Sequence, residues 1–198
     1  MPYSYAAVPC LTLKPQSTLA HPTTPPEIVK LGSPAVSVMT AFKAVHPVTT
    51  RAEVGIDAAL DKMKTAGVRL LFVVNEAGEI IGLVTAKDIM GERPIKITQQ
   101  TRMPRAEITV AMVMTPQGDI CALDAHIVRD ARVGDIVETL SAQHRQHALV
   151  VKTDKLAHTQ TVIGMFSTSQ ISKLLGYDVV HEVQPANSLA ELVAKKIA

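Results

Sequence analysis

The sequence predicts an α/β fold built from two copies of a β-α-β-β-α unit. The first observation is residues 69–90, where two short apolar runs flank a turn and lead into a helical pattern. The second is a near-copy of this pattern at residues 148–175. An internal repeat indicates units that bury their apolar faces against each other. With 198 residues, the chain is long enough for two such units that share a core.

Proline dominates the start of the chain, which we assign to an extended N-terminal arm at residues 1–35. Such a density of proline excludes a continuous helix, and disorder is the alternative interpretation. Residues 25–30 have the proline-first pattern of a short helix.

Repeat 1 is assigned to residues 36–92 and opens with a short segment that leads into a strand at 44–49. Apolar residues at helical spacing predict an amphipathic helix over 54–66, which Gly67 ends. The remaining predicted elements are strands at 70–74 and 79–85, joined by a tight turn, and a helix that begins near residue 88.

Repeat 2 is assigned to residues 110–176 and has the same order of elements with a longer hairpin loop. Pro94 and Pro104 mark the linker before it, at residues 93–109. The predicted elements of repeat 2 are a strand at 121–128, a helix at 133–143, strands at 148–152 and 161–166, and a helix at 169–175. In the tail, at residues 177–198, a capping-box pattern predicts a last short helix.

The composition is that of a globular protein without a strong charge. The formal net charge is +2 and tryptophan is absent. The chain therefore lacks the basic excess and the stacking aromatics that are typical of nucleic-acid binders. One basic cluster in the linker leaves a nucleic-acid binder as the weaker alternative: Arg93, Lys96, Arg102 and Arg105.

Cysteine and histidine spacing favours neither a disulfide nor a metal site. Cys10 and Cys121 lie far apart in different contexts, which is typical of a reduced, cytoplasmic protein. His144 and His147 have no further metal ligand nearby in the sequence. There is no leader pattern, and no apolar run approaches the roughly 20 residues of a membrane helix.

Thr85 and Asp88 are the first candidates for a functional site. They lie three residues apart where a strand gives way to a helix. Backbone N–H groups and short polar side chains at such a strand end can bind phosphate or sugar hydroxyls. An ionised carboxylate accepts hydrogen bonds, as a ribose diol requires. The alternative role for both residues is to cap the helix.

The same step recurs in repeat 2. The matched positions, repeat 1 first, are Gly82 and Gly164, Thr85 and Ser167, and Asp88 and Gln170. Upstream of each copy the tripeptide Val-Met-Thr also recurs, at residues 38–40 and 113–115.

Two β-α-β-β-α copies with Val-Met-Thr upstream and a Gly-x-x-Thr/Ser-x-x-Asp step resemble a tandem pair of CBS domains, named after cystathionine β-synthase. The resemblance covers residues 36–176. It implies that the repeats pack through their sheets as a pseudo-twofold pair with two clefts. The implied ligand is AMP, ADP, ATP or S-adenosylmethionine, and the implied assembly is a homodimer of such pairs.

On this resemblance, Asp88 contacts the ribose and Thr85 a phosphate, while Gly82 allows close approach of the backbone. Arg69 takes the position of a basic residue that meets phosphate. The resemblance puts the adenine slot on the first strand of the repeat, at His46, Pro47 and Val48.

Repeat 2 departs from the family pattern at Gln170, where aspartate or asparagine is expected. An amide carries no charge and is one methylene longer, which weakens a ribose contact. Arg145 and His147 flank the position that aligns with Arg69. We therefore expect one good site and a second, weak or empty site at Gly164, Ser167 and Gln170.

These features favour a regulatory module over an enzyme. The chain lacks P-loop, nucleophile-elbow and His-Glu-x-x-His motifs, and Asp88 alone lacks a partner for acid–base chemistry. We expect a stand-alone sensor that needs no cofactor, binds an adenine nucleotide as a regulatory ligand and acts on an unknown protein target through dimer geometry. The alternative is a protein-interaction scaffold whose ligand clefts are vestigial.

Overall fold

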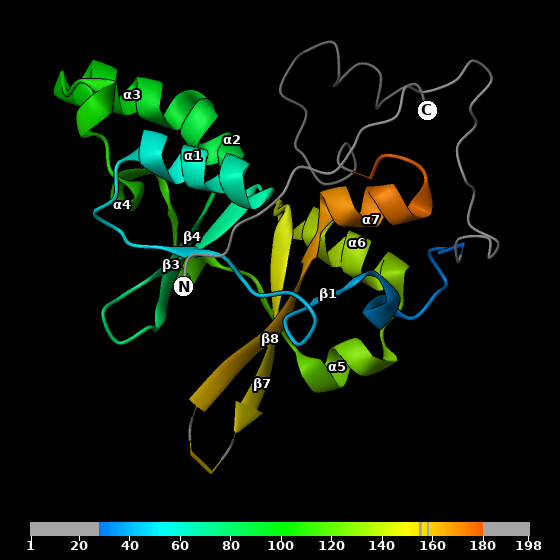
Figure 1. Cartoon of the computed structure of the whole chain (residues 1–198). Coiled ribbons are helices and arrows are strands. Elements are labelled where there is room, and N and C mark those ends of the chain that lie inside the picture. The colour runs from blue at the N-terminus through cyan, green and yellow to red at the C-terminus, as the bar shows by residue number, and fades with distance from the viewer. Residues whose placement is uncertain (1–27, 155, 158, 180–198) are drawn as a thin grey trace, which may run out of the picture.

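The computed structural model describes residues 28–154, 156–157 and 159–179. It contains two four-stranded sheets with helices packed beside each of them (Figure 1). The predicted mixed α and β fold with two related halves is confirmed. The arm up to residue 27 and the predicted C-terminal helix lie outside the described residues.

The first sheet is formed mainly by repeat 1. Its strands, in the order in which they pair, are β2 (Thr49–Thr50), β3 (Leu70–Val74), β4 (Ile80–Thr85) and β5 (Thr115–Pro116). Its helices are α1 (Ile56–Ala66) and α2 (Ala86–Met90). Gly67 ends α1 with a φ of 65°, a left-handed conformation that glycine adopts without strain.

The second sheet is formed mainly by repeat 2. Its strands, in pairing order, are β1 (Thr40–Ala41), β8 (Thr159–Ser167), β7 (His147–Asp154) and β6 (Ala122–Asp124). Its helices are α5 (Ala125–Asp130), α6 (Val133–Ala142) and α7 (Thr168–Leu175). The β7–β8 hairpin is longer than its β3–β4 counterpart and projects away from the helices (Figure 1).

Each half donates one short strand to the sheet of the other. β1 lies in the first half of the chain but pairs antiparallel with β8, and β5 follows the linker but pairs antiparallel with β4. Gly164 and Gly82 lie opposite the donated strands. A Cβ at Gly82 would be 2.8 Å from the Thr115 carbonyl oxygen, and one at Gly164 would be 2.8 Å from the Thr40 carbonyl oxygen. These two glycines therefore permit the close approach of the exchanged strands.

The segments next to the exchanged strands also pack on the opposite half. They include the 3-10 turns η1 (Ala35–Val38), η2 (Arg105–Glu107) and η3 (Gln117–Asp119), and the short helix α4 (Val110–Val113). Val38 belongs to the buried core of the second half, whereas Ile108 and Val110 belong to the core of the first. The segment that opens each predicted repeat therefore packs on the core of the other half.

A third buried cluster joins the two halves. It consists of Leu70, Phe72, Leu83 and Leu149, from β3, β4 and β7. Phe42, next to β1, packs edge-on against Phe72 with ring centroids 5.5 Å apart. The sheets of the two halves therefore share an apolar interface, as the tandem arrangement requires.

The structure contains a helix where the sequence analysis placed a linker. Residues Glu92–Thr101 form α3, and Pro94 is buried in its first turn. Proline is tolerated there because the first backbone N–H groups of a helix have no acceptor within the helix. The predicted linker at residues 93–109, which Pro94 marks in the sequence, therefore contains most of a helix.

Two predicted strands are much shorter than expected. The strand at 121–128 stops at Asp124, whose side chain accepts a hydrogen bond from the His126 N–H at 2.7 Å and so begins α5. The strand at 44–49 is reduced to β2, and of residues 44–48 only Val48 contacts β3, where its carbonyl accepts from the Phe72 N–H at 3.0 Å. The short helix expected at 25–30 is not formed at residues 28–30, and its other residues lie outside the described part.

Candidate functional site

Thr85 and Asp88 form a capping box at the start of α2. The Asp88 N–H donates to Thr85 Oγ1 at 3.2 Å, and the Thr85 N–H donates to Asp88 Oδ2 at 2.9 Å. The Thr85 hydroxyl also donates to Asp88 Oδ2, at 2.6 Å. The cap predicted as the alternative role is thus present. It fixes the carboxylate in one orientation at the end of β4.

The second oxygen of Asp88 faces Arg93, the second residue of α3. Asp88 Oδ1 lies 3.3 Å from Arg93 Nη1, and the side chain of Asp88 is 17% exposed against 48% for Arg93. The same Nη1 donates to the Val113 carbonyl at 2.6 Å. Arg93 therefore ties the end of α4 to the carboxylate.

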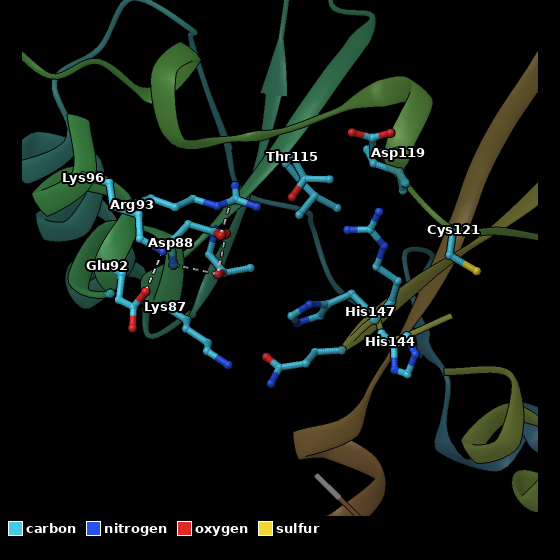
Figure 2. A pocket seen from close by; sticks show the side chains of 16 residues that line it. Lys87, Asp88, Glu92, Arg93, Lys96, Thr115, Asp119, Cys121, His144 and His147 are labelled. Carbon is cyan, nitrogen blue, oxygen red and sulfur yellow. Dashed lines mark hydrogen bonds and ion pairs between the residues drawn. The ribbon is translucent and has the colours of Figure 1, made fainter. Parts of the chain in front are cut away.

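These groups line a cavity of about 640 Å³ between the two halves, a volume typical of small-molecule sites. It is lined by Leu83, Thr85, Lys87, Asp88, Gly91, Glu92, Arg93, Lys96, Thr115, Asp119, Ile120, Cys121, His144, Arg145, Gln146 and His147. Figure 2 shows Lys87, Asp88 and Arg93 along one wall and Cys121, His144 and His147 along the facing wall.

The walls come from both repeats because of the strand exchange. One wall is the end of β4 with α2 and the start of α3. The other is the η3 turn and the start of β7, and β5, which pairs with β4, lies beside the first wall. Ala86 N–H donates to the Arg69 carbonyl at 2.9 Å, and Thr168 N–H donates to the Gln146 carbonyl at 3.0 Å, so each helix start is fixed to the strand beside it.

Basic side chains outnumber carboxylates along the cavity. Its cations are Lys87, Arg93, Lys96 and Arg145, and its carboxylates are Asp88, Glu92 and Asp119. Lys96 pairs with Glu92 at 2.7 Å, and this contact lowers the pKa of the Glu92 carboxyl. Lys87 and Arg145 have no ion-pair partner among the described residues.

His147 is held in its neutral form. Burial lowers its pKa from 6.5 to about 4; the nearby Asp88 carboxylate raises it and the Arg69 guanidinium lowers it further. Burial likewise raises the pKa of the Cys121 thiol, although Arg145 opposes this effect. Both groups are therefore uncharged at neutral pH, and they do not offset the basic side chains.

Four of the twelve residues predicted for ligand binding line this cavity: Thr85, Asp88, Arg145 and His147. By their position in the sequence, Arg145 and His147 are expected to belong with Gln170 to the site of repeat 2. The structure places them opposite Asp88 of repeat 1.

The other eight predicted residues do not line the cavity. They are His46, Pro47, Val48, Arg69, Gly82, Gly164, Ser167 and Gln170. His46 and Pro47 are exposed, and Val48 packs against the core of the first half. In repeat 2 the N–H of Gln170 donates to Ser167 Oγ at 3.2 Å, which caps α7.

Several lining residues were not among the predicted site residues, notably Lys87, Arg93, Lys96 and Thr115. A signal existed for Arg93 and Lys96, which belong to the basic cluster of the sequence and are spaced three apart on α3. A signal also existed for Thr115, which ends the second Val-Met-Thr tripeptide.

The basic cluster itself is largely paired with carboxylates. Arg93 contacts Asp88, Lys96 contacts Glu92, and Arg105 contacts Asp57 at 2.9 Å. Paired charges of this kind offer a weaker field to a nucleic-acid backbone than free ones.

The described residues contain neither a metal-ligand cluster nor a membrane-spanning helix. No three histidine, cysteine, aspartate or glutamate side chains are grouped so that they could hold a metal ion. None of the helices in this part is both long and apolar enough to cross a membrane.

One segment of the chain matches a known domain family. The family model of the CBS domain matches residues 22–94. No curated protein matches the chain.

Solved structures show the same fold at low identity. A conserved CBS-domain protein of unknown function from Thermoplasma acidophilum is similar with a TM-score of 0.53 and 18% identity, over 74% of this chain and 71% of that one. An uncharacterised conserved protein from Pyrococcus horikoshii has a TM-score of 0.52 and 18% identity, over 73% of this chain and 93% of that one.

A further similar structure is the CBS domain pair of a protein in complex with 5′-methylthioadenosine and S-adenosyl-L-methionine. It has a TM-score of 0.48 and 18% identity, over 73% of this chain and 100% of that one.

The family match and the two-sheet architecture agree with the repeats seen in the sequence. Residues 22–94 therefore match the CBS-domain family, and the two halves together have the fold of a CBS-domain pair.

Proposed function

We propose that this protein is a regulatory module that binds an adenosine nucleotide in the cavity between its two halves. The observation that carries the proposal is the position of Asp88, whose carboxylate is fixed by the capping box and borders a cavity rich in basic side chains. Sugar hydroxyls donate to a carboxylate, and phosphates accept from cations. A nucleotide has both groups.

In this proposal Asp88 holds the ribose hydroxyls. Its Oδ2 is occupied by Thr85, so the oxygen that faces Arg93 is the one that a diol would use. The side chain is 17% exposed, so a hydrogen bond made there is less screened by water than one on an open surface.

The phosphates would meet the cations beside Asp88. Lys87 and Arg145 have no ion-pair partner among the described residues and approach from different halves of the chain. A phosphate bound by both would pull the two walls together. A ligand that binds one arrangement of the halves better than another shifts the population toward it, and we propose that a homodimer passes this shift to a protein target.

The proposal is tested by calorimetric titration of the full chain with AMP and ATP. Asp88→Ala should weaken binding by roughly tenfold or more, because a charged hydrogen-bond acceptor is lost. Asp88→Asn, which keeps the size of the side chain, should weaken it as well and guards against a loss of folding. Gln170→Ala is the matched control from repeat 2 and should change little.

A thermal-shift screen decides between the sensor and the scaffold. A ligand that binds only the folded state raises its stability, so AMP, ADP, ATP or S-adenosylmethionine should raise the melting temperature. No shift with any of them would favour a scaffold with vestigial clefts. A shift that the Asp88 variants keep in full would exclude Asp88 as the ribose contact.

A further inference from the structure

Arg93 occupies the position that a ribose would need. Its Nη1 lies 3.3 Å from Asp88 Oδ1, the oxygen that the capping box leaves free. The same nitrogen is anchored by the Val113 carbonyl at 2.6 Å and lies 3.4 Å from the Met114 carbonyl. The guanidinium is therefore held in front of the carboxylate (Figure 2).

A ribose diol and Arg93 compete for the same oxygen. Each hydroxyl is a donor, and the guanidinium is a donor as well, so a bound diol displaces Arg93 or shares the oxygen at a less favourable geometry. The ion pair is about half exposed on the arginine side. Ion pairs of this kind are weak. Breaking the Arg93–Asp88 pair therefore costs little free energy, and a second contact with the ligand can offset that cost.

Arg93 itself can supply the second contact. Of the three guanidinium nitrogens of Arg93, only Nη1 has a hydrogen-bond partner among the described residues. Nε and Nη2 therefore remain as donors for a ligand. Arginine binds phosphate through two parallel N–H groups. Lys96 lies one helical turn further along α3 and lines the same cavity. A phosphate beside Asp88 would therefore draw the guanidinium away from the carboxylate.

We propose that Arg93 is a latch on the ribose position, which is released when the same ligand brings a phosphate. The inference deepens the proposed function and depends on it. It names the ligand class: a nucleoside phosphate, in which the diol takes Asp88 and the phosphate takes Arg93. A nucleoside without phosphate must break the Arg93–Asp88 ion pair and offers Arg93 no new partner in return. S-adenosylmethionine, which carries a sulfonium cation in place of phosphate, is disfavoured for the same reason.

The experiment compares adenosine with AMP by calorimetric titration of the full chain and its Arg93→Gln variant. The unchanged protein should bind AMP at least tenfold more tightly than adenosine. Arg93→Gln should bind adenosine roughly two- to fivefold more tightly, the size expected for loss of a half-exposed ion pair. The variant should bind AMP roughly fivefold or more weakly, because a charged phosphate contact is lost.

Lys64→Gln is the control, since Lys64 pairs with Asp61 on α1 and does not line the cavity. It removes the same charge, and it should leave adenosine affinity unchanged. Adenosine affinity that is equal or weaker in Arg93→Gln overturns the latch. Equal tightening of adenosine in both variants also overturns it, because a general change of charge would then be the cause.

The latch and the proposed function fail in different ways. If Asp88→Asn loses AMP binding while Arg93→Gln leaves both affinities unchanged, the site stands and the latch does not. If neither ligand binds the unchanged protein, or if Asp88→Asn binds AMP normally, the proposed function fails and the latch fails with it.

Discussion

His147 is a residue whose proton affinity the fold has changed. It lies at the start of β7 beside Asp88 and Arg69, and burial lowers its pKa from 6.5 to about 4. In the unfolded chain the same side chain takes up a proton near pH 6.5. Between these two values, the unfolded state binds a proton that the folded state does not.

The stability of the protein should therefore fall as the pH falls from 6.5 toward 4. Above pH 6.5 both states carry neutral His147 and this residue contributes no pH dependence. Urea unfolding at pH 7 and pH 5 should show that His147 accounts for a loss of up to about 2 kcal/mol. His147→Gln should remove that part of the loss. His126→Gln, at an exposed histidine of α5, should leave it in place.

The local chemistry of Thr85 and Asp88 could be predicted from sequence because it depends on residues three apart. A strand end followed by a helix start sets the capping geometry within one turn. The placement of Arg145 and His147 opposite Asp88 could not be predicted in this way. It depends on which half of the chain covers which strand end, and no spacing within a repeat contains that information.

At the level of elements, the contact between β4 and the donated strand β5 depends on Gly82. A Cβ at this position would lie 2.8 Å from both the Thr115 carbonyl oxygen and the sulfur of Met114. The methionine side chain can move, whereas the carbonyl belongs to the paired strand. A methyl group at residue 82 would therefore clash with the backbone of β5.

Gly82→Ala should destabilise the protein by about 1 to 3 kcal/mol, as overpacking of a close contact does. Denaturant unfolding with the unchanged protein as reference measures this loss. Gly118→Ala is the control, because a Cβ there would meet no atom within 4 Å. A Gly82→Ala variant as stable as that control would mean that β5 can move away from β4 without cost.

Elements with a strong apolar period were predicted well, and those that depend on their surroundings were not. The hairpin strands β3 and β4 and the helices α1, α6 and α7 agree with the predicted segments to within a few residues. By contrast, α3 carries Pro94 and few buried side chains, so its sequence resembles a linker. Its place beside α2 and its contact with Val113 come from the tertiary structure.

At the level of the whole molecule, the exchanged strands make the two halves depend on each other. A fragment that ends at residue 109 would lose β5 and expose the cluster around Phe72 that Leu149 covers. We expect such a fragment to lack a cooperative unfolding transition. Adding a second fragment of residues 110–198 should restore the transition. Circular dichroism during thermal melting measures both. A fragment that melts cooperatively alone would contradict the dependence.

The duplicated architecture was visible in the sequence because both copies keep the glycine, hydroxyl and apolar positions in the same order. The exchange of β1 and β5 was not visible, since two-residue strands carry no periodicity. Their pairing is decided by edges of sheets that lie far away in the chain. Sequence repeats therefore predict that two units exist, but they do not predict which segments each unit lends to the other.

The exchange also has a consequence during biosynthesis. The β3–β4 hairpin can form as soon as Thr85 has left the ribosome, but its outer edge has no partner until Thr115 and Pro116 emerge. β1 waits even longer for its partner, because β8 is the last strand of the described residues to be made. An open sheet edge accepts any suitable strand. Nascent chains that grow side by side on one messenger RNA could therefore trade these strands and leave translation as an intertwined pair.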